Sequence, residues 1–467
     1  MKRIGYLSSR GRQGSVLILS LIFIVMLSAM AVALATMSGS NVQIAENHRK
    51  MEDTRGCAES GLEVIRYWMS KIEMSGKTER AQRFDLLASN LASVLSAAGI
   101  TNIIPAYSSG STITMSNVPL CTSRNQSFSA VLTKLSDSNV RLDVTGYEGP
   151  SGDRVSRTIR SEFVFEEQAH TVFDFGVASK GPLVMSGNVE IVGVNVAVES
   201  NAYIESMNTL VALSMSGKSE IAGNVKIANP SAAPFLGSNA SVGGKTGADA
   251  MQNIEIGASP SDFPEMAPAV FYSYATNVLT PSVDLKKAAT LTNIRIPAGM
   301  NPKFSGNATL KGVVLIEAPN VVEFTGGASI TGVIVTNGDR TDDSGANQLI
   351  FRGHVAGLSV ALLPQEPQFS GLQSQTGTFI IAPGFSLSFG GTFDAIGGAI
   401  AANGIEFFGN AGGMIQGSVI NYANKETKVW GNSSLMFNRS GLTEVPAGFV
   451  PEIILQYDPS AYSEVLL

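Results

Sequence analysis

The sequence predicts an α+β N-terminal part, made of one long hydrophobic helix and a small antiparallel sheet, followed by an all-β parallel β-helix. Two observations lead to this prediction. Residues 15–37 form an uncharged apolar run, and from about residue 175 short apolar stretches recur with glycine and asparagine between them. A chain of 467 residues also exceeds what one ordinary core holds, so several units are expected.

The apolar run is long enough to cross a membrane. A helix rises about 1.5 Å per residue, so the run reaches the ~30 Å of a bilayer hydrocarbon core. Residues 1–14 form a basic leader without any acidic residue. Its basic side chains are Lys2, Arg3, Arg10 and Arg12. The positive-inside rule then predicts a single-pass protein with this leader in the cytoplasm and the C-terminal part outside it.

Three export fates fit this run. The first is a secretory signal peptide, but its apolar region is usually about 7–15 residues long, and this run is longer. Small residues typical of a cleavage site do occur at Ala33-Leu34-Ala35. The second is a permanent membrane anchor. The third is a short basic leader that ends in glycine and is cut on the cytoplasmic side, between Gly14 and Ser15, so that the apolar helix remains.

The helical pattern continues beyond the membrane-spanning half, through residues 38–75. Apolar residues recur with heptad spacing and form a seam that supports this. The second set of positions in this heptad pattern is polar near the membrane, where it holds His48 and Arg55. The seam residues are Ile44, Met51, Ala58, Leu62, Ile65, Met69 and Ile72. We therefore expect one helix to about Ser75, packed on other elements in its lower part. Glycines mark places of bending or close approach, at Gly39, Gly56 and Gly61.

Several motifs in the first 70 residues resemble the N-terminal domain of PilX-type minor pilins. They are Arg12-Gln13-Gly14, the apolar run, Glu46-Asn47-His48-Arg49 and Ala58-Glu59-Ser60-Gly61-Leu62. The resemblance implies prepilin cleavage between Gly14 and Ser15, and packing against other pilin subunits through the helix. Major pilins carry glutamate at the fifth mature position, where this chain has Leu19. The departure favours a tip, priming or accessory subunit.

Residues 76–168 are predicted to form a pilin-like α/β head. An amphipathic helix with Phe84, Leu87 and Leu91 on one face would end at Gly99. Alternating apolar and polar residues then predict strands at 128–135, 140–147 and 155–165, with a turn at 148–153. An extracytoplasmic location permits a disulfide between Cys57 and Cys121, while two small buried hydrophobic residues are the other interpretation.

Residues 169–445 are predicted to form the β-helix. The segment 183–193, LVMSGNVEIVG, returns as LSMSGKSEIAG at 213–223. An aromatic residue followed by a small turn recurs at spacings mostly near twenty, at Phe304, Phe324, Phe351, Phe369, Phe389, Phe408 and Trp430. One rung of a parallel β-helix needs such a repeat with glycine and asparagine at its corners. A β-sandwich is the alternative, and the spacing of leucine-rich repeats is missing.

Two stretches depart from this repeat. Residues 228–290 are predicted to make an excursion over the solenoid, with a short helix at 271–277, and residues 336–347 form a polar loop between rungs. The C-terminal tail, residues 446–467, is expected to cap the open end of the solenoid, since the last rung would otherwise expose a sheet edge.

The polar residues do not suggest an enzyme or a cofactor site. Carbohydrate-active β-helices need paired carboxylates on neighbouring rungs, and the charged residues of 349–422 do not recur in register. These residues are Arg352, His354, Glu366, Asp394 and Glu406. Asp339, Asp342 and Asp343 are the one weak metal candidate, for calcium, with a solvated turn as the other interpretation and Arg340 opposing a cation. We expect no cofactor.

The sequence therefore favours a structural protein, a minor pilin or pseudopilin-like subunit of a type IV pilus or secretion fibre that presents a β-solenoid. The expected partners are other pilin subunits, the bacterial inner membrane, and a surface or carbohydrate ligand. The net charge of −6 gives no reason to expect nucleic acid. The alternatives are a membrane-anchored β-solenoid adhesin or envelope scaffold, and a carbohydrate-active β-helix enzyme.

Overall fold

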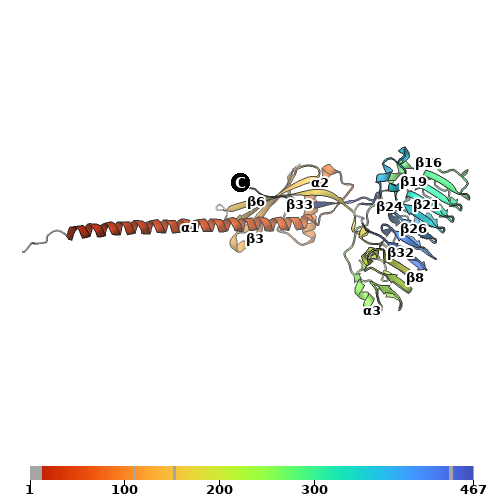
Figure 1. Ribbon diagram of the computed structural model, residues 1–467, viewed down its shortest axis with the longest axis horizontal. Coiled ribbons are helices and arrows are strands. Elements are labelled where there is room, and N and C mark those ends of the chain that lie inside the picture. Colours follow the sequence, from red (N-terminus) through yellow and green to blue (C-terminus); the bar gives the residue numbers. More distant parts are fainter. Residues whose placement is uncertain (1–12, 109–110, 151–153, 441–444, 466–467) are drawn as a thin grey trace, which may run out of the picture. The chain divides into compact units, whose positions relative to one another are not determined.

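The computed structural model describes residues 13–108, 111–150, 154–440 and 445–465, and its chain divides into two units (Figure 1). The first unit contains residues up to Met74, Thr78–Glu166 and the C-terminal residues from Ile454. The second unit contains Ser75–Lys77 and Glu167–Ile453. Residues 1–12 of the predicted basic leader lie outside the described residues.

One helix, α1 (Gln13–Met69), contains the predicted membrane-spanning half and most of its predicted continuation. At about 1.5 Å per residue its length is about 85 Å. The apolar seam is buried in its lower part, at Ala58, Leu62, Ile65 and Met69, where α1 packs against strands of the first unit. Ile44, by contrast, is 55% exposed. The helix ends six residues before the predicted Ser75, because the chain turns there into a short strand.

The first unit contains a seven-stranded sheet in the order β1-β33-β6-β5-β4-β3-β2. Its strands are β1 (Met74–Ser75), β2 (Ala106–Ser108), β3 (Thr112–Cys121), β4 (Gln126–Lys134), β5 (Asn139–Glu148), β6 (Val155–Gln168) and β33 (Glu452–Val465). The pairs from β2 to β6 are antiparallel. The predicted second helix is α2 (Arg80–Ala97), with Phe84, Leu87 and Leu91 buried. The small antiparallel sheet is thus confirmed, with β1, β2, β3 and β33 as strands that the alternation did not reveal.

The C-terminal strand β33 overturns the expectation that the tail caps the solenoid. In the sheet β33 lies between β1 and β6, so the whole solenoid is inserted between two neighbouring strands of the first unit. The strand also contacts α1. Arg55 Nε lies 3.0 Å from Glu464 Oε1, and the Arg66 guanidinium lies over the ring of Tyr457 at 4.6 Å. Pairing with β6 satisfies the hydrogen-bonding groups of the β33 backbone. A polar tail lying over the last rung would not require such pairing.

Two glycines let α1 approach the sheet closely. A Cβ atom at Gly61 would lie 2.6 Å from the ring of Phe128. At Gly146, on β5, a Cβ atom would lie 2.1 Å from the carbonyl oxygen of Thr54. Gly39 and Gly56, in contrast, have no such neighbour within 4 Å. Of the three glycines predicted to mark close approach in the helix, Gly61 is the one that does.

The second unit contains a 26-stranded sheet of mainly parallel pairs, coiled as a β-helix. The first group of strands is β7 (Val177–Ser179), β8 (Leu183–Gly193), β9 (Ala202–Ile204), β10 (Leu213–Ile221), β11 (Val225–Ile227), β12 (Phe235–Leu236), β13 (Ser241–Val242), β14 (Lys245–Thr246) and β15 (Ile254–Ile256). The predicted repeat is a pair of stacked rungs, because Leu183 pairs with Leu213 and Ile191 with Ile221 in unbroken register. A small helix, α3 (Gly247–Ala250), lies in the last of these rungs.

The second group of strands builds the rest of the solenoid. It comprises β16 (Asn277–Val278), β17 (Ala289–Ile296), β18 (Lys303–Phe304), β19 (Ala308–Ile316), β20 (Val321–Phe324), β21 (Ala328–Thr336), β22 (Gln348–Phe351), β23 (Val355–Leu358), β24 (Thr378–Ala382), β25 (Ser386–Phe389), β26 (Thr392–Ile396), β27 (Ala399–Ala402), β28 (Ile405–Phe407), β29 (Gly412–Ile415), β30 (Val419–Asn421), β31 (Thr427–Gly431) and β32 (Ser434–Phe437). Like residues stack here too, for example Ala308 on Ala328 and Ile400 on Val419.

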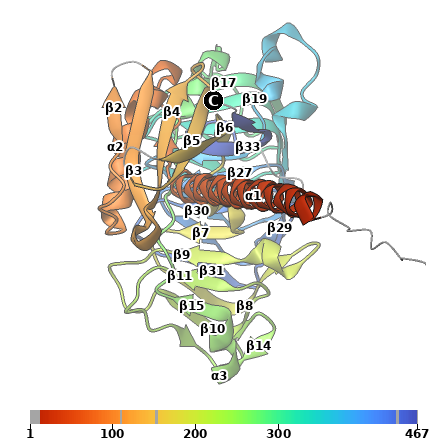
Figure 2. The ribbon, with the colours of Figure 1, turned by 90° about the vertical axis from the view of Figure 1, so that its left-hand side faces the viewer.

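The chain enters the solenoid in its middle. From β7 the rungs advance to one end, at β12–β15, and the chain then crosses to the other end, at β16 and β17. From there the rungs return until β30 pairs with β7, and β31 and β32 pair with β8. Figure 2 shows this order on one face, where β27, β30, β7, β9, β11 and β15 follow one another. The sequentially last rung is therefore the spatial neighbour of the first.

The predicted excursion is shorter than residues 228–290. Residues 235–256 supply a further rung, whose strands pair with β10 and β11. The crossing itself contains a 3-10 helix, η5 (Pro268–Tyr274), near the expected short helix. Tyrosine hydroxyls fix the crossing to the rungs, because Tyr422 Oη donates to the carbonyl of Pro264 at 2.6 Å and Tyr203 Oη accepts from Ser261 N at 2.8 Å.

The crossing explains the unbroken apolar runs of the sequence. Residues 313–316, 333–335, 379–382 and 399–402 are apolar and buried throughout, whereas strands of the other faces alternate buried and more exposed residues. The outer side of these four runs is covered by the crossing, where Phe271 is fully buried, and by 3-10 turns that contribute Val360, Phe369 and Leu372. A strand that is covered on both faces needs apolar residues at every position.

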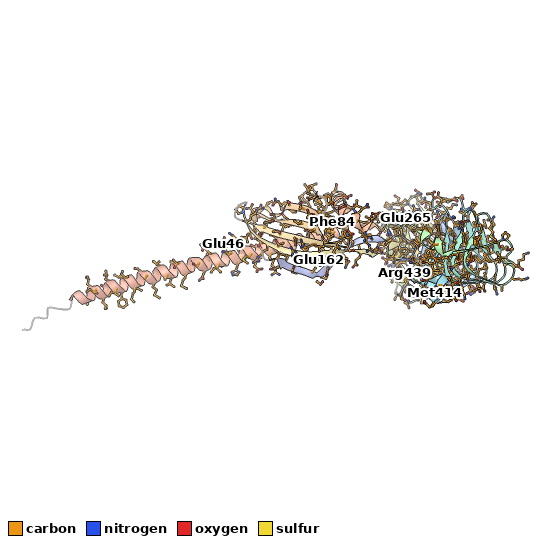
Figure 3. All side chains as sticks on the ribbon, turned by 90° about the horizontal axis from the view of Figure 1, so that it is seen from above. Glu46, Phe84, Glu162, Glu265, Met414 and Arg439 are labelled. Atoms are coloured by element: carbon orange, nitrogen blue, oxygen red, sulfur yellow. The ribbon has the colours of Figure 1, made fainter. Side chains whose placement is uncertain are left out.

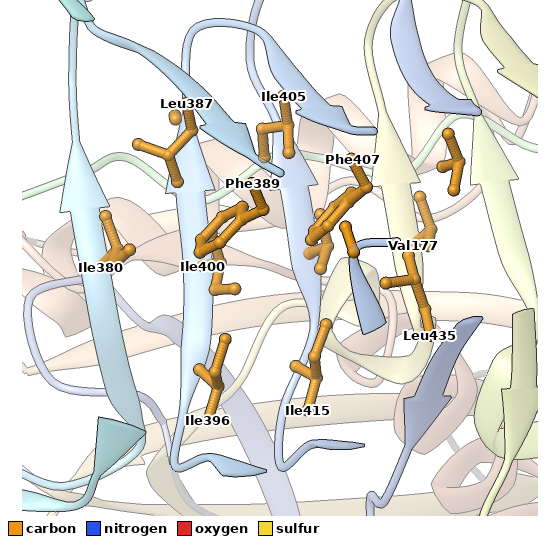
Figure 4. Close-up of a cluster of buried hydrophobic side chains, with 14 of the residues drawn as sticks. Val177, Ile380, Leu387, Phe389, Ile396, Ile400, Ile405, Phe407, Ile415 and Leu435 are labelled. Atoms are coloured by element: carbon orange, nitrogen blue, oxygen red, sulfur yellow. The ribbon is translucent and has the colours of Figure 1, made fainter. Parts of the chain in front are cut away.

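Phenylalanines form a stacked column inside the solenoid. The rings of Phe304, Phe324, Phe351, Phe389 and Phe407 follow one another at centroid distances of 4.5–5.1 Å. Figure 4 shows Phe389 and Phe407 lying parallel, with Leu387 beside Ile405. Three members of the predicted recurrence lie elsewhere. Phe369 is in the cluster under the crossing, and Phe408 stacks with Trp430 on the outer surface of the solenoid.

Buried asparagines occupy one corner of successive rungs. Their side-chain carbonyls accept backbone N–H groups of neighbouring rungs, as in Asn301 N to Asn320 Oδ1 at 2.7 Å and Asn320 N to Asn347 Oδ1 at 3.0 Å. Asn403 and Asn421 continue the pattern by accepting from Gly384 N and Gly404 N. Asparagine suits these corners because its amide both accepts and donates where the strand ladder is interrupted.

Candidate functional site

The upper half of α1 is the first candidate site. Residues 13–45 carry no charge, and the large apolar side chains from Val16 to Ile44 keep between 50% and 72% of their surface exposed. Figure 3 shows these side chains projecting from the bare helix before Glu46. In the described residues α1 is the one helix long and apolar enough to cross a membrane, by length and composition. A surface of this kind needs lipid or other apolar helices around it.

Charged residues begin where the bare part of α1 ends. Lys50 Nζ lies 3.5 Å from Glu46 Oε1, and Arg49 Nη1 lies 3.3 Å from Asp53 Oδ2, each one turn apart. Arg49 also approaches Glu148, on β5, at 3.8 Å. Glu148 is almost fully buried, and this burial, reinforced by Asp53, raises the pKa of its carboxyl. The polar boundary thus coincides with the first contacts between α1 and the sheet.

The two cysteines are free thiols in the structure. Cys57 is buried at the contact with Gly146, and burial, aided by the charges of Glu148 and Asp53, raises its pKa. Cys121 lies at the end of β3, where a hydrogen bond with Ser123 lowers its pKa. The structure contains no bond between them.

The three predicted calcium ligands lie in one loop, where Asp339 and Asp342 accept from backbone N–H groups of their own turns and Asp343 accepts from a side chain of another rung. Asp339 accepts from Thr341 N at 2.8 Å and Asp342 from Ser344 N at 2.9 Å, and these bonds lower the pKa of both carboxyls. Asp343 accepts from Asn403 Nδ2 at 2.8 Å. Within the described ranges no three His, Cys, Asp or Glu side chains are placed to hold a metal ion. Each of the three carboxylates therefore has a hydrogen-bond partner within the protein.

Two of the charged residues weighed for catalysis do meet. His354 Nε2 lies 3.2 Å from Asp394 Oδ2, and His354 Nδ1 lies 3.1 Å from Thr392 Oγ1. The sequence did not reveal this pair, because the rungs that contain the two residues differ in length. Both side chains are largely exposed, at 48% and 76%. Glu406 lies on another strand and accepts from Trp430 Nε1 at 2.8 Å, so Asp394 and Glu406 do not form a carboxylate pair.

The comparisons with known proteins assign the N-terminal segment. Residues 13–63 match the family model described as PilX N-terminal. The chain is also similar to the solved structure of the competence-associated pilin ComZ from Thermus thermophilus, with 12% identity and a TM-score of 0.25 over 89% of this chain and 97% of that one. No curated protein matches. The family match thus lies on residues 13–63, the segment whose motifs resemble the N-terminal domain of PilX-type minor pilins.

Proposed function

We propose that the chain is an accessory subunit of a type IV pilus or a related secretion pseudopilus, and that it presents its β-helix to the surroundings of the fibre. The observation that carries this proposal is that the PilX N-terminal match lies on a helix whose two halves differ in their surroundings. The helix is bare and apolar before Glu46 and packed on a folded head after Thr54. A simple membrane anchor would need only the first of these halves.

Assembly would use the bare half of α1. In the membrane its apolar side chains contact lipid, and in a fibre the same side chains pack against the helices of neighbouring pilin subunits. The charged boundary from Glu46 to Asp53 keeps the head in water in both states. The resemblance to minor pilins implies the bacterial inner membrane as the starting place, with the C-terminal part in the periplasm.

Leu19 supports an accessory role rather than that of the repeating subunit. Cleavage between Gly14 and Ser15 makes Leu19 the fifth mature residue. The resemblance implies a glutamate there in major pilins, thought to pair with the free N-terminal amine of a neighbouring subunit. A leucine leaves such an amine without its carboxylate partner, so a copy of this chain is expected at low stoichiometry.

The proposal is tested at the mature N-terminus and in sheared fibres. Mass spectrometry of the native protein is expected to find an N-terminus at Ser15, and the protein is expected in the fibre fraction after shearing of cells. A Gly14→Glu variant, which blocks the small-residue cleavage position, is the matched control and should stay in the membrane fraction. An intact Met1 together with absence from fibres would favour the anchored adhesin or envelope scaffold instead.

A further inference from the structure

The outer surface of the solenoid contains a polar hollow of about 690 Å³ over strands β22, β25, β28 and β31. Two long corners flank it, residues 337–347 and 422–426, whereas the rungs between them turn within two or three residues at Gly384 and Asn403. Further lining comes from Pro182 and Thr209 of the next rungs. The hollow therefore results from a difference in corner length between adjacent rungs.

The wall of this hollow is fixed in place. Asn403 Nδ2 donates to Asp343 Oδ1 at 2.8 Å and to the carbonyl of Arg340, which fastens the long loop to the short corner beneath it. Asn347 Nδ2 donates to Asp342 Oδ2 at 3.1 Å at the other end of the loop. A wall that is held before any ligand arrives loses little conformational entropy on binding.

The floor of the hollow offers hydroxyl, amide and charged groups. Alternate residues of each strand point outward, which brings side chains from four stacked strands onto one surface. The outward residues are Gln348, Ser386, Ser388, Glu406 and Lys428. The charges of the lining balance in number, since it contains Lys425, Lys428, Glu406 and Glu426, and Glu426 and Lys428 lie 3.2 Å apart.

A flat aromatic platform continues the same surface. Phe408 and Trp430 each follow an outward residue of the hollow by two positions, and their rings stack at a centroid distance of 5.7 Å and an angle of 23°. Trp430 Nε1 donates to Glu406 Oε1 at 2.8 Å, which fixes the indole plane. On its other side Trp430 is in register with Ser186, an exposed small residue. One indole face is thus covered by Phe408, while the rung beyond it leaves the other face open.

We propose that this hollow and the Trp430 platform bind a neutral polysaccharide chain. A sugar ring has an apolar C–H face, which packs on an aromatic ring, and a rim of hydroxyls, which exchange hydrogen bonds with side chains such as Ser388, Gln348 and Glu406. Strands lie about 4.8 Å apart, so the four strands span about 14 Å, enough for a short run of sugar rings along the solenoid axis.

Charge selects a neutral chain over a polyanion. Nucleic acids and acidic polysaccharides need an excess of lysine and arginine along their path. Here each lysine of the lining is matched by a glutamate, and the whole chain has a net charge of −6. The inference goes beyond the fibre role and does not depend on it, because the hollow belongs to the solenoid alone.

The test uses fluorescence of the full chain in detergent micelles. The protein has two tryptophans, so a Trp68→Phe variant reports on Trp430 alone. It is titrated with uncharged oligomers of glucose, mannose, galactose and N-acetylglucosamine. At least one of these is expected to give a saturable change in Trp430 emission that persists at high salt, because the attraction does not depend on charge.

Substitutions distinguish specific binding at Trp430 from nonspecific binding of the polysaccharide. In affinity electrophoresis with the polymer that binds, Trp430→Ala is expected to weaken binding about tenfold or more, and Trp430→Phe to retain part of it. Leu362→Ala is the matched control, because Leu362 is 65% exposed outside the hollow, and it should change nothing. Unchanged unfolding midpoints establish that the variants fold.

Three results would overturn the proposal. The first is that none of the neutral oligomers perturbs Trp430. The second is that a folded Trp430→Ala chain binds as well as the unaltered one. The third is that duplex DNA or an acidic polysaccharide binds instead, with an affinity that falls steeply as salt rises. None of these outcomes bears on cleavage at Ser15 or on recovery from fibres, so the failure of one proposal is distinguishable from that of the other.

Discussion

The carboxylate of Glu199 accepts a hydrogen bond from the backbone N–H of Arg439 at 3.0 Å, across 240 positions of sequence. Glu199 lies in η3 (Ala197–Ser200), after the first long strand of the solenoid, and Arg439 follows its last strand. The same carboxylate accepts from Asn195 N at 2.7 Å. One buried side chain therefore joins the two sequence halves of the solenoid where the first and last rungs meet.

Replacing this carboxylate should loosen that join. A Glu199→Gln variant keeps the size of the side chain but replaces one carboxylate oxygen with an NH₂ group. This group cannot accept a hydrogen bond, so one buried N–H that donated to the carboxylate is left without a partner. We expect a loss of about 1–3 kcal/mol in the free energy of unfolding of the solenoid. Denaturant titration of the full chain measures it, and Glu190→Gln, on the more exposed side of β8, is a control that should lose much less.

The effect should also depend on pH. Burial acts against the charged form of Glu199, but hydrogen bonds from Asn195, Arg439 and Val196 outweigh it and lower its pKa from 4.5 to about 2. A lowered folded pKa gives stability that is present above the unfolded value and is lost as the pH falls from about 5 toward 2. The difference between the unaltered chain and Glu199→Gln should therefore shrink at pH 3. An equal difference at pH 7 and pH 3 would contradict the assignment.

The phenylalanine column should be sensitive to truncation. Phe351 is fully buried, with the rings of Phe324 and Phe389 each 5.0 Å away. Phe351→Ala is expected to cost about 3–5 kcal/mol, because the neighbouring rungs cannot collapse into the gap while their strands keep register. Phe235→Ala is the control, since Phe235 is 54% exposed. A similar unfolding midpoint for the two variants would be inconsistent with a stacked interior.

Close approach of α1 to the sheet predicts opposite results at two glycines. Gly146→Ala would bring a methyl group to 2.1 Å from the carbonyl oxygen of Thr54, so the helix must shift. We expect about 1–3 kcal/mol of destabilisation, and faster reaction of the buried Cys57 thiol with a maleimide. Gly39→Ala has no neighbour within 4 Å and should leave both readouts unchanged. Slow labelling of Cys57 in Gly146→Ala would mean that the contact is looser than described.

Removal of β33 should unfold the first unit rather than the solenoid. A chain that stops after Ile453 leaves β6 without its neighbour and removes Tyr457, whose ring lies 5.6 Å from that of Phe163. Limited proteolysis is expected to cut within residues 78–166 while the solenoid persists as a resistant fragment. Glu464→Ala, which removes only an exposed partner of Arg55, should leave the digestion pattern unchanged. Protection of the head in the truncated chain would show that β33 is dispensable.

Local repeats made the elements of the solenoid predictable. The likeness of residues 183–193 and 213–223 foretold the register that pairs Met185 with Met215. The same strand also pairs with β31, where Met185 lies beside Val429, and the likeness of sequence at that contact is limited to Gly187-Asn188 and Gly431-Asn432. Rungs that meet only in space share a need for apolar residues of similar size, which many sequence positions satisfy. The order of rungs was therefore beyond the reach of periodicity.

The head and the polar sites show the same limit. Helices α1 and α2 follow from apolar spacing, whereas β33 carries so many polar residues that its pairing with β6 depends on the backbone, which a sequence pattern does not encode. His354 and Asp394 meet because intervening loops of unequal length bring β26 beside β23. Such encounters require the register of every rung between them. The aspartates at 339, 342 and 343 look alike in sequence, but each has a different partner, and that of Asp343 is Asn403 on another rung.

The two connections of the solenoid to the rest of the chain both leave from its middle, since β7 and the last rung are neighbours. Each end of the stack is thus a free end, and in the part of the chain that the structure describes the crossing that contains η5 joins one end to the other. Duplication or loss of a rung at either end changes the length of the stack without altering the attachment strands β6 and β33. Evolution or protein engineering can therefore lengthen the solenoid by adding rungs at its two ends, while the strands that connect it to the first unit stay the same.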